Sequence, residues 1–320
     1  MRVIHLTTPE SVKAAAADLH PHAMAIGDFD GVHLGHQQVI QTAVQTAGRS
    51  GLRSSVMTFH PHPREVLGNS VYAKFLAPFE EKLKQFERLE IDHVFIVSFH
   101  ADFAKLSPAQ FVQQYIEELA CEAVIVGFDF TFGSRGAGTV DTLRELAGQR
   151  LNVQVVPPFQ LDGQKVSSTY IREQLHLGEI GEATRFLGRK YALQGKVVHG
   201  DGRGSSIGFP TANVELDSAF VLPKRGVYAV RVHLMETGTV QNGVMNIGRR
   251  PTFHDHQTED SIEVHLFDYS GDLYGQGLRV EIMAYVRDER KFASVDELVE
   301  QIRMDAEQAR QMLLTDRTLT

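Results

Sequence analysis

The sequence has a single cysteine, Cys121, among its 320 residues. One thiol cannot form an internal disulfide or a cysteine-rich zinc site, and such scarcity fits a reducing compartment. We therefore expect Cys121 to be a buried packing residue.

The sequence also lacks an excess of basic charge and any long apolar run. Lysine and arginine total 32 against 40 acidic residues, a formal net charge of −8. Phosphate-backbone binding rests on clustered Lys and Arg, and no such cluster stands out. No stretch approaches the roughly 20 apolar residues that span a bilayer, and residues 1–20 lack the apolar core of a signal peptide. We expect a cytoplasmic protein without a nucleic-acid or membrane partner, and the sequence defines no oligomeric state.

Two nucleotide-binding motifs are missing as well. G-x-G-x-x-G does not follow the first predicted strand, and a Walker A motif occurs nowhere. Their absence disfavours a P-loop enzyme and a dinucleotide-dependent oxidoreductase.

Residues 24–159 alternate short apolar runs with longer helical stretches. The runs lie at 24–27, 54–59, 93–99, 123–128 and 152–159, and the expected helices at 35–48, 79–90, 108–120 and 139–149. Ser107 and Gln110 can form a capping box at the start of the third helix. This alternation predicts a parallel, doubly wound α/β sheet.

The pattern changes in the second half. Residues 191–286 form apolar runs separated by Gly, Asp and Pro, which favours an antiparallel barrel or sandwich. A capping box of Ser294 and Glu297 predicts a final helix whose apolar face contains Val295, Leu298, Val299 and Ile302. The expected domains are 1–184 and 185–320.

Polar clusters follow the strands predicted in the first half. They are "GDFDGVHLGH" (27–36), "HPHP" (60–63), "GFDFTFG" (127–133) and, after a short excursion, "VSSTYIR" (166–172). In an open parallel sheet, ligands bind outside the carboxyl ends of the strands, where helix N-termini also converge. We expect the four clusters to share one rim.

The residue types at this rim suit nucleotide phosphates. Gly27 and Gly31 let the backbone approach a ligand closely, and His33 and His36 open a helix whose free N–H groups attract anions. The two imidazoles can stabilise charge that builds up on a phosphate, so no protein nucleophile is required.

The third and fourth clusters contribute further polar groups. The hydroxyls of Ser167, Ser168 and Thr169 can donate to phosphate oxygens, and Arg172 adds a fixed positive charge. Asp129 is either a ligand to ribose or base, or a turn residue.

Each of these features also has a structural interpretation. A Gly-Asp corner is commonly a turn, a serine before a helix is commonly a cap, and His60 and His62 can simply shape a loop around Pro61. The functional interpretation therefore depends on the clusters occurring together.

The second half has its own dense patch at residues 195–216. Its glycines favour a loop that folds closely over a ligand. Thr211 and Asn213 lie two residues apart, on the same side of an extended segment, and offer the oxygen ligands that Mg²⁺ prefers. A glycine-rich hairpin with an Asn turn is the structural alternative.

A strand at 261–267 places Glu263, His265 and Phe267 on one face. A carboxylate there can accept a proton from an alcohol that attacks a γ-phosphate. It can equally be a solvated surface group, and the spacing does not decide between the two.

The motifs together resemble a known family. "GDFDGVHLGH" carries the H-x-G-H signature of nucleotidylyltransferases, and with "VGFDFTFG" and "SSTYIR" it is similar to the FMN adenylyltransferase module of bacterial bifunctional riboflavin kinase/FAD synthetases. "GFPTAN", "GVYAV", "MNIGRRPTF", "IEVHLFDYSGDLYG" and "VRDERKF" follow the riboflavin kinase pattern in order. The resemblance implies a nucleotidylyltransferase α/β domain followed by a six-stranded barrel with a terminal helix.

For the first half, the resemblance implies that the phosphate of FMN attacks the α-phosphorus of ATP, with Mg²⁺ assisting, to give FAD and pyrophosphate. The implied ATP-binding residues are Gly27, Asp28, Phe29, Gly31, His33, His36, Ser168, Thr169 and Arg172; His33, His36 and Arg172 are the implied catalytic residues, and His60, Pro61 and Asp129 are the implied FMN-binding residues. The family often has Asn where Asp28 stands, so a role that requires an amide donor is in question.

For the second half, the resemblance implies phosphorylation of riboflavin by ATP to give FMN and ADP. Glu263 is the implied catalytic base, Thr211 and Asn213 the implied Mg²⁺–ATP ligands, and Arg287 and Phe292 the implied flavin contacts. The implied phosphate-covering loop contains Gly195, Gly200, Gly202, Arg203, Gly204, Ser205 and Gly208. Relatives commonly have a basic residue where Ser205 and Ser206 stand, and Arg203 is a candidate substitute.

Two alternatives remain open. One is a flavin- or nucleotide-binding regulatory protein that has lost catalysis. The other is a protein in which one module is active and the second is inactive, and Ser205 and Ser206 in the loop favour the kinase half as the inactive module. The presence of His33, His36, Arg172, Thr211, Asn213 and Glu263 favours a working enzyme.

Overall fold

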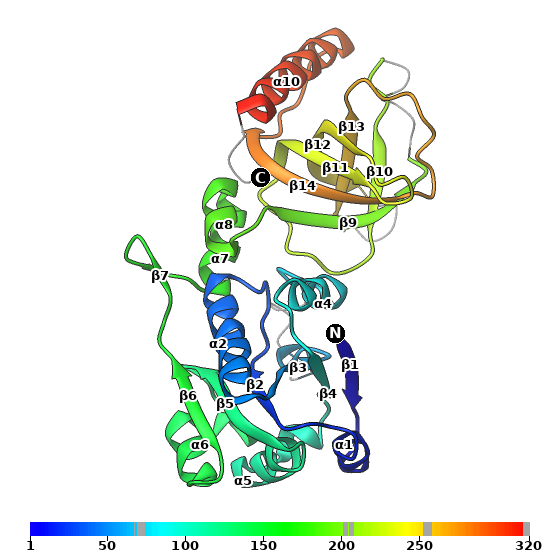
Figure 1. The fold of residues 1–320 in the computed structure, drawn as a ribbon. Helices are drawn as coiled ribbons and strands as arrows, with labels where there is room; N and C mark the ends of the chain where they lie inside the picture. Colours follow the sequence, from blue (N-terminus) through cyan, green and yellow to red (C-terminus); the bar gives the residue numbers. More distant parts are fainter. Residues whose placement is uncertain (67, 69–73, 201–203, 205–207, 252–257, 316–320) are drawn as a thin grey trace. The chain divides into compact units, whose positions relative to one another are not determined.

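The computed structural model describes residues 1–66, 68, 74–200, 204, 208–251 and 258–315 (Figure 1). Its contacts divide the chain into two compact units, Met1–Ser168 and Thr169–Thr320. The domain boundary expected between residues 184 and 185 stays a prediction.

The first unit is built on a six-stranded, entirely parallel sheet. Its order is β1-β4-β3-β2-β5-β6. The strands are β1 (Arg2–Leu6), β2 (His22–Ile26), β3 (Arg53–His60), β4 (His93–Ser98), β5 (Cys121–Gly127) and β6 (Asn152–Val156). The predicted doubly wound sheet is confirmed. Strand β1, which pairs with β4 at the edge, was not predicted.

Helices connect the strands of this sheet. They are α1 (Pro9–Ala16), α2 (Leu34–Ser50), α3 (Pro63–Val66), α4 (Phe79–Arg88), α5 (Pro108–Phe111), the π-helical η3 (Val112–Glu117) and α6 (Val140–Ala147), with short 3₁₀ turns η2 (Phe103–Lys105) and η4 (Ser134–Gly136). The capping box of Ser107 and Gln110 is present. The helix predicted over 108–120 is therefore one α-helical turn that continues as a π-helix.

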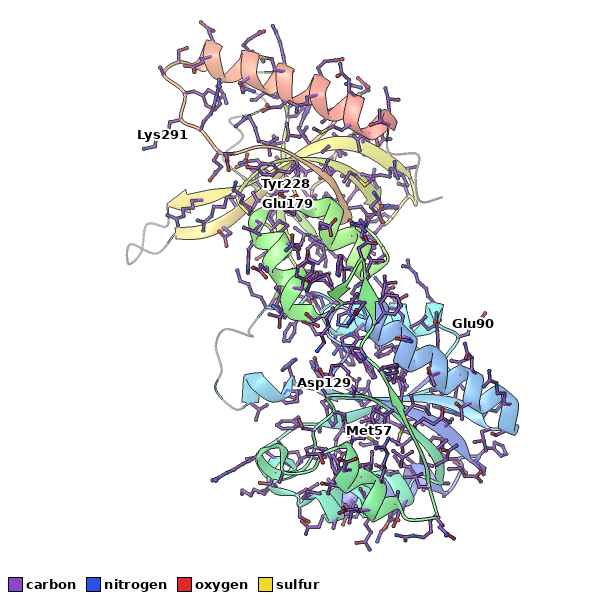
Figure 2. All side chains as sticks on the ribbon, turned by 90° about the vertical axis from the view of Figure 1, so that its left-hand side faces the viewer. Met57, Glu90, Asp129, Glu179, Tyr228 and Lys291 are labelled. Carbon is purple, nitrogen blue, oxygen red and sulfur yellow. The ribbon has the colours of Figure 1, made fainter. Side chains whose placement is uncertain are left out.

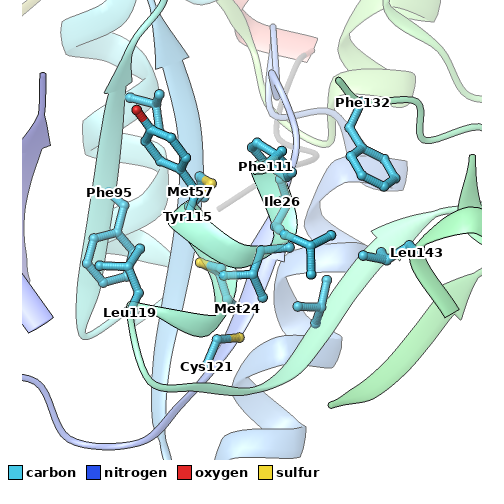
Figure 3. Packing of buried hydrophobic residues seen from close by; sticks show 14 of the residues in the cluster. Met24, Ile26, Met57, Phe95, Phe111, Tyr115, Leu119, Cys121, Phe132 and Leu143 are labelled. Atoms are coloured by element: carbon cyan, nitrogen blue, oxygen red, sulfur yellow. The ribbon is translucent and has the colours of Figure 1, made fainter. Parts of the chain in front are cut away.

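The core of the first unit lies on both faces of the sheet, because neighbouring residues of each strand point to opposite sides. Met24, Ile26 and Met57 pack with Phe111 and residues of α1, η3 and α6 on one face (Figure 3). The intervening residues of the same strands pack against α2 and α4 on the other face. Cys121 is buried, as expected, and burial raises the pKa of its thiol.

A two-stranded hairpin, β7 (Gln160–Leu161) and β8 (Gln164–Lys165), follows the sheet. Helix α7 (Ser168–Leu177) then starts at the last residue of the first unit, and α8 (Ile180–Leu187) leads to the barrel.

The barrel is closed, antiparallel and six-stranded, in the order β10-β13-β12-β11-β14-β9. Its strands are β9 (Tyr191–Val198), β10 (Ala212–Leu216), β11 (Gly226–Leu234), β12 (Val240–Pro251), β13 (Thr258–Leu266) and β14 (Gly277–Arg287). Closure removes exposed strand edges. The barrel prediction is confirmed.

Helix α10 (Val295–Thr315) packs outside the barrel against β11, β12 and β14. The Ser294 hydroxyl accepts from the Glu297 N–H, and the Glu297 carboxylate accepts from the Ala293 N–H. The predicted helix start is confirmed, but Val295 is 60% exposed and does not belong to the apolar face.

Candidate functional site

The first polar cluster forms a tight corner directly after the central strand β2. The chain continues from β2 to β3 on one side, and β5 pairs with β2 on the other, so the corner lies where the strand order reverses. Ligands of doubly wound sheets bind at such a point. The corner thus lies at the carboxyl end of β2, at the edge of the sheet where the sequence predicted a binding site.

Backbone strain is concentrated in this corner. Phe29 and Val32 have φ of 56° and 41°, in the left-handed region that side chains with a Cβ rarely adopt, beside Gly31 at 87°. A Cβ added to Gly27 would lie 2.9 Å from the Phe29 ring. Glycine is therefore required at residue 27 by close approach and at residue 31 by backbone conformation.

His33 and His36 are arranged together at the start of α2. His33 is the N-cap, and its Nδ1 accepts from the His36 backbone N–H at 3.2 Å. The two rings stack with centroids 3.5 Å apart, and the edge of Phe29 contacts His36 at 5.4 Å between centroids. Both imidazoles are thus fixed beside the helix N–H groups that attract anions.

Asp28 is the centre of a charged cluster in the corner. His62 Nε2 donates to its Oδ2 at 3.0 Å, and Lys82 Nζ lies 3.7 Å from Oδ1. Burial alone raises the pKa of the Asp28 carboxyl, but the Lys82 charge and the His62 hydrogen bond outweigh it and hold the pKa well below its usual range. The sequence singled out His62 through its motif but gave no signal for Lys82, because a lysine in a helix ordinarily faces solvent.

Ser168 also reaches this corner. Its hydroxyl donates to the Asp30 carbonyl at 2.9 Å. Along α7, Thr169 is exposed and Arg172 is half-buried.

The predicted FMN residues lie at the ends of the strands that flank β2. His60 ends β3, contacts the Phe79 ring in a tilted arrangement with centroids 4.5 Å apart, and forms a cis peptide with Pro61. Asp129 follows β5, where Figure 2 labels it, and pairs with Lys165 at 3.2 Å. The Lys165 ammonium lies 4.4 Å from the centroid of the exposed Phe128 ring. The sequence predicted neither Lys165 nor Phe128 as a neighbour of the site.

In the barrel, two glycines of the predicted loop lie against the two predicted metal ligands. A Cβ on Gly200 would collide with the Asn213 amide, and one on Gly204 would lie 3.0 Å from Thr211 Oγ1. The chain therefore needs glycine to approach these side chains.

Other parts of the loop prediction have different outcomes. Gly195 lies within β9, against the backbone of Glu215 on β10, so the expectation that the loop begins at Gly195 is wrong. The residues 202, 203, 205 and 206 lie outside the described part of the chain. Gly208 has φ of 87° and lies shortly before Thr211.

Glu263 lies beside Asn213 across a strand pair. The register of β13 pairs Glu263 with Asn213 on β10 and with Asn246 on β12. Ile262 and Val264 are buried in the barrel, so Glu263 points outward, and the alternation predicted for this strand is confirmed.

A cavity of about 330 Å³ brings several predicted residues together. Thr211, Glu263, Arg287 and Phe292 all line it. Sequence reasoning missed four further polar lining residues, Asn246, Glu289, Arg290 and Asp305. The sequence does not show that β12 pairs with β13; with that pairing known, the register alone would have placed Asn246 beside Glu263.

A second cavity of about 280 Å³ opens on the other side of Thr211. It is lined by Val197, Leu266 and the segment 269–274. Tyr274 of this segment stacks on His199, with centroids 4.1 Å apart. Thr211 lines both cavities, so the two cavities share this residue in their walls.

Comparison with known proteins identifies the family. The FAD synthetase family model matches residues 15–170, and the riboflavin kinase model matches residues 187–313. A bifunctional riboflavin kinase/FMN adenylyltransferase of Bacillus subtilis is 44% identical over 97% of both chains. The chain belongs to the bifunctional riboflavin kinase/FMN adenylyltransferase family.

A further relative and a solved structure are similar to the chain over most of its length. The Escherichia coli bifunctional riboflavin kinase/FMN adenylyltransferase is 36% identical over 90% of this chain and 91% of its own. A solved structure described as a macrolide-efflux protein from Streptococcus pneumoniae has a TM-score of 0.84 at 31% identity, over 96% of this chain and 99% of that one. The two activities of the family are those predicted from the motifs, and the chain is an enzyme of flavin cofactor biosynthesis with ATP as co-substrate.

Two features are absent from the described residues. No helix among them has the length and apolar character needed to cross a bilayer. In the same part of the chain, no group of three or more His, Cys, Asp or Glu side chains is placed to hold a metal ion.

Proposed function

We propose that the two reactions use the two sites described above: the barrel phosphorylates riboflavin to FMN, and the rim of the parallel sheet adenylylates FMN to FAD. The functional division falls after residue 184, between the segments matched by the two family models. The observation that carries the kinase assignment is the shared wall at Thr211, because phosphoryl transfer requires two ligands to meet at one point.

In the kinase site, riboflavin occupies the cavity lined by Glu263, Arg287 and Phe292, and ATP occupies the cavity lined by segment 269–274. The Glu263 carboxylate accepts the proton of the ribityl 5′-hydroxyl. The hydroxyl oxygen forms a bond to the γ-phosphorus, the bond to the β,γ-bridging oxygen breaks, and ADP leaves.

The residues around Thr211 also fit Mg²⁺. Thr211 and Asn213 provide hard oxygen donors, and Gly200 and Gly204 pack so closely against them that a Cβ would displace these side chains. These two side chains would hold the ion, which when bound to ATP neutralises phosphate charge.

In the adenylyltransferase site, the triphosphate lies at the N-terminus of α2. A phosphate oxygen of FMN attacks the α-phosphorus of ATP, the bond to the β-phosphate breaks, and pyrophosphate leaves. His33 and His36 stabilise the charge that develops, and Ser168, Thr169 and Arg172 bind the triphosphate. His60, Pro61 and Asp129 contact FMN, Gly27 to Gly31 form the corner, and Mg²⁺ accompanies ATP.

One incubation tests both assignments. The purified chain is supplied with riboflavin, ATP and Mg²⁺, and the flavins are separated. FAD is the expected product. Accumulation of FMN alone would refute the adenylyltransferase assignment. If riboflavin gave no product but FMN, supplied in its place, became FAD, the kinase half would be inactive.

A further inference from the structure

The corner that carries His33 and His36 is supported by a segment without any recognised motif, residues 76–86. Three consecutive corner residues contact it. Asp28 contacts Lys82, the Phe29 ring meets the edge of Phe86 at 6.0 Å, and Asp30 Oδ1 accepts from the backbone N–H groups of Leu76 and Ala77 at 2.9 and 3.2 Å. Each of the three corner residues 28–30 therefore has its own contact in segment 76–86.

Lys82 makes the most unusual of these contacts. Its side chain is only 7% exposed, and Nζ donates to the main-chain carbonyl of Asp28 at 2.7 Å. Lysine is rarely buried, since removing its charge from water costs free energy unless it is paired and hydrogen-bonded. Here the same ammonium lies 3.7 Å from the Asp28 carboxylate, which provides the pairing.

The carbonyl that Lys82 holds belongs to the strained part of the chain. Thr58 Oγ1 donates to the same oxygen at 3.0 Å, so two donors from different elements fix this peptide. The next residue, Phe29, has φ of 56°, and its ring edge contacts His36. Strained conformations persist only where the surroundings impose them, and Lys82 is part of those surroundings.

We propose that Lys82 is a positioning residue of the adenylyltransferase: by holding the Asp28 carbonyl, it maintains the corner conformation that places Phe29 against His36. This inference rests on the proposed function of His33 and His36. Lys82 itself acts through the corner and contacts no substrate in the proposal.

The carbonyl contact and the carboxylate contact are separable by substitution. Lys82→Met keeps the length of the side chain but removes both contacts and leaves the half-buried Asp28 carboxylate beside one cation fewer. In D28N the carboxylate is already absent, so the change from D28N to D28N/K82M removes the ammonium and its hydrogen bond to the carbonyl without leaving a carboxylate unpaired. Lys105→Met, at a lysine whose side chain is 74% exposed, is the matched control.

The measurement is steady-state conversion of FMN to FAD, with riboflavin phosphorylation by the same sample reporting on the barrel. We expect D28N/K82M to have kcat about tenfold or more below that of D28N, with a much smaller change in KM for ATP, because misplaced imidazoles lose transition-state stabilisation. Lys82→Arg, which retains a donor and the charge, should recover part of the rate. K105M should match the parent protein in both reactions.

Equal adenylyltransferase rates for D28N/K82M and D28N would overturn the proposal, since Lys82 would then only balance the Asp28 charge. Equal losses in FAD formation and riboflavin phosphorylation would also overturn it, as the effect would be one on the whole chain. Failure of the proposed function itself is distinguishable, because His33→Ala and His36→Ala would then leave FAD formation unchanged.

Discussion

The Arg287 guanidinium and the Asp305 carboxylate form a two-pronged ion pair between β14 and α10. Nε lies 2.8 Å from Oδ1, and Nη2 lies 2.8 Å from Oδ2. The Asp305 side chain is 4% exposed, and Gln301 Nε2 donates to its Oδ1 at 2.7 Å. Arg287 and Asp305 both line the larger cavity. The pair therefore fixes, from the terminal helix, the orientation of Arg287, the side chain proposed to contact the flavin.

Asp305→Asn should weaken riboflavin binding. The substitution removes the charge that orients Arg287, so we expect KM for riboflavin to rise about tenfold or more and kcat to change less. Steady-state phosphorylation of riboflavin measures both. Glu307→Gln, a change on an exposed residue of the same helix, is the control. A fall in kcat at constant KM would contradict a role in flavin binding.

Glu263→Gln should abolish FMN formation, because an amide cannot accept the proton of the 5′-hydroxyl. The conversion of supplied FMN to FAD should stay near the parent rate, since this reaction is assigned to the other unit. Both rates can be followed by separating the flavins after incubation with ATP. Loss of both activities would count against independent sites.

Replacing His33 or His36 with alanine should lower the rate of FAD formation by about 10²-fold or more, the size found for other preorganised donors to a transition state. Riboflavin phosphorylation by the same variant is the internal control. An unchanged rate of FAD formation would show that the stacked imidazoles are only structural.

The stability of the first unit should fall as the pH falls from about 6.5 to 4. His22 is fully buried, and burial lowers its pKa from 6.5 to about 4, so the unfolded chain binds a proton that the folded chain does not. This linkage removes about 3 kcal/mol of stability by pH 4 and leaves stability unaffected above pH 6.5. Burial lowers the pKa of His93 as well, and its effect has the same sign.

Urea unfolding of the full chain at pH 7 and pH 4.5 measures this loss. His22→Leu should show a smaller difference between the two pH values, because it removes the titrating group. A variant with the same difference as the parent would exclude His22 as the source.

The sequence predicted the elements whose signals are local. The strands β2 to β6 and β9, β11, β12, β13 and β14 were visible as apolar runs, and the caps at Ser107 and Ser294 as residue pairs three apart. Strand β1 escaped because its residues are mostly exposed at the sheet edge and form no apolar run. Val295 was wrongly assigned to the apolar face of α10. It fits the helical period of apolar residues, but in the first turn it packs against no neighbouring element that the structure describes and is exposed.

The residues proposed to act in the two sites also differ in how visible they are in the sequence. His33, His36 and Glu263 stand in compact motifs, so the sequence singled them out, and their roles stay predictions. Lys82 and Asp305 are charged residues inside helices, where the ordinary expectation is exposure to solvent. Only the tertiary structure shows that each is buried against a partner from another element.

The barrel closes through β9 and β14 without any contribution from α10, yet α10 supplies Leu298, Ile302 and Asp305 to the wall of the larger cavity. The helix that completes this wall is synthesised after all six strands of the barrel. Under the proposed function, a chain that ends before α10 would therefore carry the proposed base on β13 but lack part of the proposed flavin site.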